Sequence, residues 1–218
     1  MEIWMTSAPY LGLAGLLVSL LLYRNVKSGD PGSQKMVEIS EAIHEGAMAF
    51  LKREYTILLI FVAVVFCLLF LLIQPATAYA FLGGAACSIV CGYVGMKAAT
   101  RANVRTAQSA NQQGQGPALM TAFSGGAVMG LAVAGLGLFG VATLAQVFGL
   151  WTDSTVASNI SGFAMGASSI ALFARVGGGI FTKTADVVIA NLPEKTLIAM
   201  GLDYESLLKI FALKDFKP

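Results

Sequence analysis

Long apolar runs alternate with short polar segments along this chain. The runs cover about residues 4–23, 55–73, 78–98, 118–150 and 160–182, and each contains at most one charged residue. About 20 apolar residues suffice for a helix to cross the hydrocarbon core of a bilayer. The pattern predicts an all-α integral membrane protein, a bundle of about five transmembrane helices. The fourth run exceeds one crossing, so we expect it to tilt or to project into water.

The polar segments predict a cytoplasmic helix and two connections. Residues 28–33 form a turn-rich linker. An apolar stripe from Met36 to Leu51 predicts a helix over 36–54 that continues into the second span. The segment 100–117 is rich in Gln, Asn, Ala and Gly and predicts a polar loop. A cleaved signal peptide is the alternative for the first run, but no basic residue precedes it and no clear cleavage site follows it before Arg24.

Composition and charge support a multi-pass membrane protein. Hydrophobic residues make up 56% of the chain and charged residues 12%, whereas soluble chains carry roughly 25% charged residues. All 14 basic residues lie on one side of the predicted spans. Since basic residues favour the cytoplasmic side, we expect the N-terminus outside and the basic loops and the tail in the cytoplasm. The net charge of +2 and the absence of a basic, aromatic patch indicate no nucleic-acid partner.

The last apolar run carries the candidate chemistry. Arg175 interrupts it, and Lys183 and Asp186 follow after three glycines at 177–179. In one helix, Arg175 and Asp186 share a face and are about 16 Å apart along the axis. An arginine in an apolar helix is costly in lipid, and such residues usually face a bundle interior or a water-filled path. The glycines indicate a close approach to the backbone, either by another helix or by a phosphate.

Several other residues allow a structural or a functional interpretation. His44 is either a solvated or packing residue or a ligand, and Cys87 and Cys91 are either small packing residues or metal ligands. Glu38, Glu41 and Glu45 form either a solvated face or a metal site. Arg101 and Arg105 are either positive-inside anchors or the border of an entrance for an anionic substrate. Small residues at three- and four-residue spacing predict close helix packing, with a pore-lining role as the alternative. They are Gly84, Ser88, Cys91, Gly95, Gly126, Gly130, Gly162 and Gly166.

The sequence ALFARVGGGIFTKTAD, at 171–186, resembles the fifth membrane helix of the membrane-bound, ion-translocating inorganic pyrophosphatases. The segments EISEAIHEGAMAFLKREY at 38–55, ANVRTAQSA at 102–110 and AFSGGAVMGLAVAGLGLFG at 122–140 agree with this family and occur in its order. The resemblance covers about residues 10–187. It implies a partial membrane pyrophosphatase fold over 1–186, followed by a divergent cytoplasmic tail at 187–218.

The resemblance also implies a function. Family members couple Mg²⁺-dependent hydrolysis of inorganic pyrophosphate to translocation of H⁺ or Na⁺ across the lipid bilayer, and the full-length proteins form homodimers. Carried over residue by residue, Lys183 is a catalytic residue that binds the substrate, Asp186 is a catalytic residue that holds the metal, and Arg175 belongs to the ion gate.

The chain departs from the family after Asp186. The second aspartate of the family motif falls on Ala190 and its lysine on Glu194. Family members are also several times longer. We therefore expect this chain to represent the N-terminal part of such a pump, to be inactive alone, and to have a C-terminal remainder as a possible partner. A truncation, a frameshift or a split gene each explains this pattern. The alternative is a non-enzymatic small helical membrane protein or assembly partner.

The one-sided charge distribution predicts the topology. Single cysteines introduced at positions 75 and 155 should react with a membrane-impermeant reagent from outside, and cysteines at 30 and 110 only from the cytoplasm. Labelling of position 110 from outside would contradict this orientation.

Overall fold

The protein is described here by a computed structural model that covers residues 2–149 and 157–190, with side chains for 6–149 and 157–178. The chain divides into two compact units, Met1–Ala174 and Arg175–Pro218. The predicted tail at 187–218 falls almost entirely outside the described residues.

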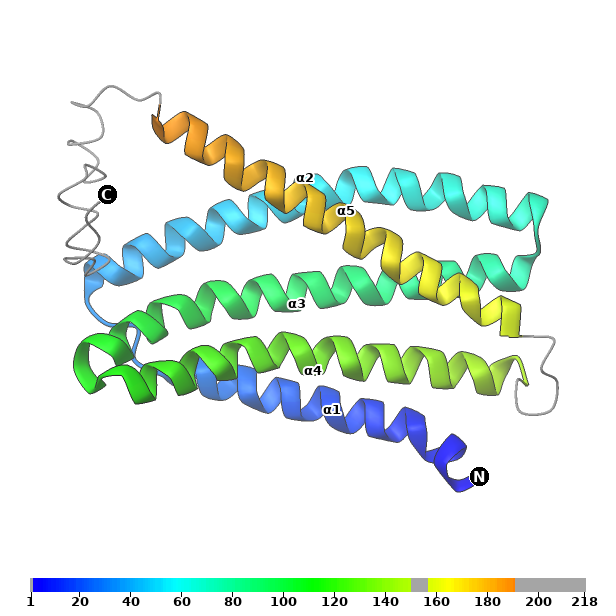
Figure 1. Ribbon diagram of the computed structural model, residues 1–218, viewed down its shortest axis with the longest axis horizontal. Helices are drawn as coiled ribbons and strands as arrows, with labels where there is room; N and C mark the ends of the chain where they lie inside the picture. Colours follow the sequence, from blue (N-terminus) through cyan, green and yellow to red (C-terminus); the bar gives the residue numbers. More distant parts are fainter. Residues whose placement is uncertain (1, 150–156, 191–218) are drawn as a thin grey trace. The chain divides into compact units, whose positions relative to one another are not determined.

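The described residues form long helices, as the apolar runs predict (Figure 1). In chain order these are α1 (Glu2–Ser28), α2 (Gln34–Leu72), α3 (Pro75–Gln113), α4 (Gln115–Val147) and α5 (Ala157–Ala190). Each contains a segment long and apolar enough to cross a membrane. Together they confirm an all-α membrane bundle.

A serine cap and a proline define where α2 and α3 begin. Ser33 caps α2, because its hydroxyl accepts a hydrogen bond from the backbone N–H of Met36 at 3.4 Å. Between α2 and α3, Gln74 is extended (φ −163°, ψ 151°), because the residue before a proline avoids the helical region. Pro75 then begins α3, where its missing N–H costs nothing. The two helices therefore form a tight antiparallel hairpin.

The polar segment at 100–117 is helical except at Gly114, so the prediction of a loop there is wrong. Helix α3 continues to Gln113, and only Gly114 separates it from α4. The segment before Gly114 contains no proline or glycine and is rich in alanine, glutamine and arginine, which favour helix. Gly114 has φ +88°, a conformation that L side chains rarely adopt, and it reverses the chain at this single position. The polar composition of this segment therefore does not indicate the end of the helix.

The core is narrow and built mostly from small side chains. Helix α4 packs against both α1 and α3, and α2 packs against α3. The largest side chains with almost no exposure are Phe81, Val128 and Ile170. Around Phe81 and Ile170 lies an apolar cluster to which α2 contributes Leu58 and Val62. Most large apolar residues outside this core are exposed, as expected for helices that face lipid.

Glycines allow two pairs of helices to approach at the backbone. A Cβ added to Gly84 of α3 would collide with the carbonyl oxygen of Phe163, and one added to Gly166 of α5 with that of Phe81. Similarly, a Cβ on Gly12 of α1 would lie 2.7 Å from the carbonyl oxygen of Gly135 on α4. The predicted packing role is thus confirmed for Gly84 and Gly166.

Gly126 and Gly130 behave differently. No described atom lies within 4 Å of a Cβ added to either of them. Both are exposed on α4. The small-residue spacing in α4 therefore does not mark a contact within the described part of the chain.

These two environments give a matched pair of substitutions. Gly166→Ala should lower the free energy of unfolding in detergent by about 1–3 kcal/mol, because the added methyl group overpacks a backbone contact. Gly130→Ala should be neutral or slightly stabilising, since it adds a methyl group in open space and improves helix propensity. Unfolding by heat or by a denaturing detergent measures both. Equal stabilities for the two variants would contradict this account of the α3–α5 crossing.

Candidate functional site

The three residues singled out for chemistry all lie on α5. The helix is continuous from Ala157 to Ala190, which is the condition that the spacing argument for Arg175 and Asp186 requires. The side chain of Arg175 is exposed. The side chains of Lys183 and Asp186 lie outside the described residues, so their catalytic and metal-binding roles stay predictions.

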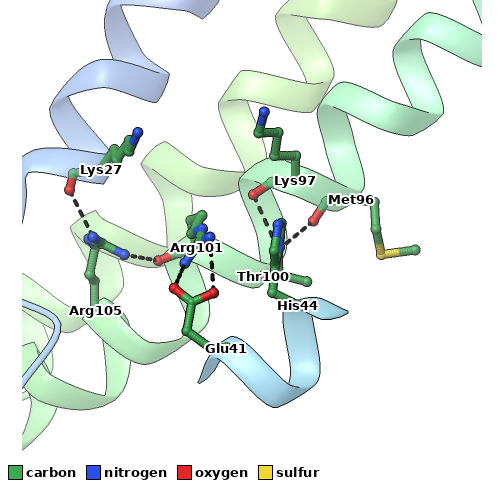
Figure 2. Close-up of polar contacts among 8 residues, drawn as sticks. All are labelled: Lys27, Glu41, His44, Met96, Lys97, Thr100, Arg101 and Arg105. Carbon is green, nitrogen blue, oxygen red and sulfur yellow. Dashed lines mark hydrogen bonds and ion pairs between the residues drawn. The ribbon is translucent and has the colours of Figure 1, made fainter. Parts of the chain in front are cut away.

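A polar cluster at the basic end of the bundle joins α2 to α3 (Figure 2). Arg101 of α3 donates from both terminal guanidinium nitrogens to the carboxylate of Glu41 on α2, with Nη2 and Oε2 3.2 Å apart. The side chain of Arg101 is 23% exposed and that of Glu41 54% exposed, so solvent screens this pair. The bidentate geometry of this ion pair fixes the register of α2 and α3 more than it adds stability. Arg101 keeps the pKa of Glu41 below its ordinary value through this hydrogen bond.

Arg105, one turn along α3, binds backbone carbonyls instead of an acid. Its Nη2 donates to the carbonyl oxygen of Lys27 at 2.8 Å (Figure 2). Its Nε donates to the carbonyl oxygen of Gly29 at 3.0 Å. Its Nη1 donates to the carbonyl oxygen of Arg101 at 2.7 Å. The last carbonyls of a helix lack partners within the helix and carry partial negative charge. Arg105 therefore caps the C-terminus of α1.

The linker between α1 and α2 is held by the same helix. Asp30 accepts a hydrogen bond from the side-chain amide of Gln108 at 3.0 Å and one from the backbone N–H of Gly32 at 2.9 Å. These two hydrogen bonds lower the pKa of Asp30. The C-terminal part of α3, which was predicted to be a loop, is thus a helix to which the linker is hydrogen-bonded.

His44 takes part in this cluster through α3. Its Nδ1 lies 2.8 Å from the hydroxyl oxygen of Thr100. That hydroxyl lies 3.0 Å from the carbonyl oxygen of Met96, to which it can donate. With the hydroxyl proton so placed, Nδ1–H of His44 is the donor to Thr100. Partial burial, and then the positive charge of Arg101, lower the pKa of His44 below its ordinary value of 6.5.

These contacts favour structural roles for residues whose function the sequence left open. Arg101 and Arg105 are engaged with protein groups, which disfavours an entrance for an anionic substrate at their side chains. Cys91 donates to the carbonyl oxygen of Ala132 at 3.7 Å, as a small packing residue does. Within the described residues, no group of three His, Cys, Asp or Glu side chains is placed to hold a metal ion.

Sequence reasoning missed the pairing of Glu41 with Arg101. Sixty residues separate them, and a loop over 100–117 would not have presented Arg101 at a fixed position. The available signal was the helix-forming composition of the segment before Gly114, which allowed one helical register to run from the span to Gln113.

Residues 13–197 match the family of inorganic H⁺ pyrophosphatases. The chain belongs to this family. The match ends ten residues beyond the limit of 187 expected from the sequence.

Curated relatives of this family include both proton and sodium pumps. The chain is 46% identical over 203 residues to a K⁺-insensitive pyrophosphate-energized proton pump of Methanosarcina mazei and 45% identical over 201 residues to a putative K⁺-stimulated pyrophosphate-energized sodium pump of Clostridium tetani. Each alignment covers 89% of this chain and 29% of the relative. A K⁺-stimulated sodium pump of Thermotoga maritima is 41% identical over 79% of the chain and 26% of its own length. The chain thus spans under a third of these pyrophosphatases and matches their N-terminal part.

His44 gives a direct test of the polar cluster, because it is the sole histidine of the chain. Its pKa, measured by NMR in detergent, should lie below 6.5, and Arg101→Ala should raise it by removing a nearby cation and freeing Glu41. Since folding favours the neutral imidazole, its contribution to stability is complete above pH 6.5 and is lost as the pH falls toward the folded pKa.

His44→Gln is the control, because it removes the titration and should flatten the pH dependence of stability in that window. A pKa above 6.5 in the unsubstituted protein, or a lower pKa in Arg101→Ala, would show that the cluster is not arranged as described.

Proposed function

We propose that this chain forms the N-terminal helical part of a pyrophosphate-energized ion pump, in which hydrolysis of inorganic pyrophosphate drives H⁺ or Na⁺ across the membrane. The observation that carries this proposal is 45–46% identity, over 89% of the chain, to relatives named as such pumps. The apolar helices agree with an integral, multi-pass protein. Near-equal identity to a proton pump and a sodium pump leaves both ions as candidates.

Within this pump, Lys183 would bind phosphate oxygens, Asp186 would bind Mg²⁺, and Arg175 would belong to the ion gate. The continuity of α5 supports this division, because it keeps Arg175 and Asp186 on one face about 16 Å apart. When bound, Mg²⁺ would neutralise charge on the diphosphate. Asp186 is the one carboxylate that the resemblance assigns to the metal, and Ala190 stands at the position of the second aspartate of the family motif. The residues present therefore do not make a complete Mg²⁺ site.

Two features of the first unit agree with a bundle that is completed by further helices. Oε2 of Glu54 is buried and has no hydrogen-bond partner among the described residues. Buried polar atoms without a partner are rare in native proteins. Gly126 and Gly130 form a smooth, exposed face on α4, where an added Cβ would meet no described atom of another helix within 4 Å. Such a face suits close packing by another membrane helix.

The orientation belongs to the same proposal. The α1–α2 linker and the turn at Gly114 lie at the end that carries Arg24, Lys27, Arg101 and Arg105. By the positive-inside rule this end faces the cytoplasm, and the N-terminus lies outside.

Complementation tests the proposal. The chain alone in vesicles should show no Mg²⁺-dependent hydrolysis of pyrophosphate above background. Co-expression with the C-terminal part of the Methanosarcina mazei pump should restore hydrolysis and ion transport. In that assembly, Asp186→Asn should weaken binding of a non-hydrolysable pyrophosphate analogue, because it removes a negative charge at the metal. Arg175→Ala should leave analogue affinity nearly unchanged and reduce transport.

Asp30→Asn is the matched control, because it neutralises an aspartate in the linker and should leave both activities unchanged. Equal loss of analogue affinity in Asp186→Asn and Arg175→Ala would reject the division into a chemical end and a gating end. A stable assembly without hydrolysis would favour the alternative, a non-enzymatic assembly partner.

A further inference from the structure

An apolar groove runs between α1 and α3, and α4 forms its floor. Helices α1 and α3 both pack against α4 and touch each other little. The groove has a volume of about 370 Å³. Val128, Ala132 and Leu136 lie along its floor. An enclosed apolar cavity of about 150 Å³ already accommodates benzene, so this groove has room for several carbons of a hydrocarbon chain.

One end of the groove carries polar and positively charged side chains. Tyr23 of α1, and Tyr93 and Lys97 of α3, line it at the basic end of the bundle. The Nζ of Lys97 lies 5.4 Å from the centre of the Tyr93 ring and 3.5 Å from its hydroxyl oxygen. Among the described residues the single ion pair joins Arg101 to Glu41. Lys97 therefore presents a charge that no described carboxylate neutralises.

This arrangement matches the chemistry of a membrane lipid. Apolar side chains line the part of the groove that lies within the predicted spans, and tyrosine and lysine lie where the spans leave the membrane. Tyrosine hydroxyls and lysine ammonium groups at this depth bind phosphate oxygens, and basic residues attract anionic headgroups. Burial of a lipid tail here brings no hydrophobic gain over the bilayer. Selectivity must therefore come from the headgroup.

We propose that the groove binds an anionic phospholipid from the leaflet at the basic end, with one acyl chain against α4 and the phosphate beside Lys97 and Tyr93. The lipid would fill the space between α1 and α3 and complete the contact between these two helices. The residues that line the groove do not include Arg175, Lys183 or Asp186, so the proposal does not depend on the proposed pump activity.

Native mass spectrometry of the purified chain tests the site, with phosphatidylglycerol and phosphatidylcholine as the lipid probes. The unsubstituted chain should prefer phosphatidylglycerol. Lys97→Gln should lower apparent affinity for phosphatidylglycerol about five-fold, the factor expected for one basic residue near an anionic lipid, and leave phosphatidylcholine unchanged. Lys97→Arg should retain the preference. Val90→Trp should reduce retention of both lipids, because residue 90 lines the groove and is 48% exposed.

Two matched controls separate the groove from general effects. Lys35→Gln removes the same charge from α2, and Val64→Trp adds the same bulk to an exposed face of α2. Neither should alter lipid retention, and circular dichroism should show the same helicity for every variant.

Equal affinities for phosphatidylglycerol in Lys97→Gln and the unsubstituted chain would overturn the proposal. An equal loss in Lys35→Gln would also overturn it, since the attraction would then be unspecific. If Val90→Trp instead abolished self-association without changing lipid retention, the groove would be a contact between copies of the chain.

Discussion

A helix inside a bilayer must satisfy its own backbone hydrogen bonds, and this constraint determines where the chain can turn. The described breaks follow it: the linker after Ser28, the pair Ile73 and Gln74, and the single residue Gly114 lie between long helices. Each break is defined by local chemistry, namely a capping serine, a proline or a glycine with positive φ. Everything between these points remains helical, including polar segments that leave the membrane.

Within those limits, two kinds of contact hold the helices of the first unit together. In the apolar part, glycines have no side chain, so the backbones of neighbouring helices can meet, as at Gly84 with Phe163 and at Gly166 with Phe81. Lipid tails are as apolar as leucine, so close packing rather than hydrophobicity selects these contacts. At the basic end, charged and polar side chains act instead. Arg105 caps α1, and Arg101 fixes α2, both from the extension of α3.

The residues proposed for function belong to the other unit. Arg175, Lys183 and Asp186 lie in the second unit, beyond the boundary at Ala174. The chain covers 29% of the length of the Methanosarcina mazei and Clostridium tetani relatives. Phosphoryl chemistry depends on several charges that converge on one substrate. A chain that matches the N-terminal part of these relatives can therefore have a defined helical bundle without a complete phosphoryl-transfer site.

The sequence by itself determined the class of the protein and the local register of its candidate residues. Apolar runs identified membrane helices, because length and hydropathy are local properties. The motif on α5 identified the family, which the match over residues 13–197 confirmed. The 11-residue spacing placed Arg175 and Asp186 on one face, because a continuous helix has fixed geometry.

Only the tertiary structure decided which surfaces meet. The same small-residue spacing occurs at Gly162 and Gly166 and at Gly126 and Gly130, yet only the first pair contacts another described helix. Likewise, nothing near Glu41 in the sequence indicates Arg101. Periodicity defines the face on which a residue lies, but a partner 60 or more residues away depends on the helix ends and on the direction in which each helix leaves its turn.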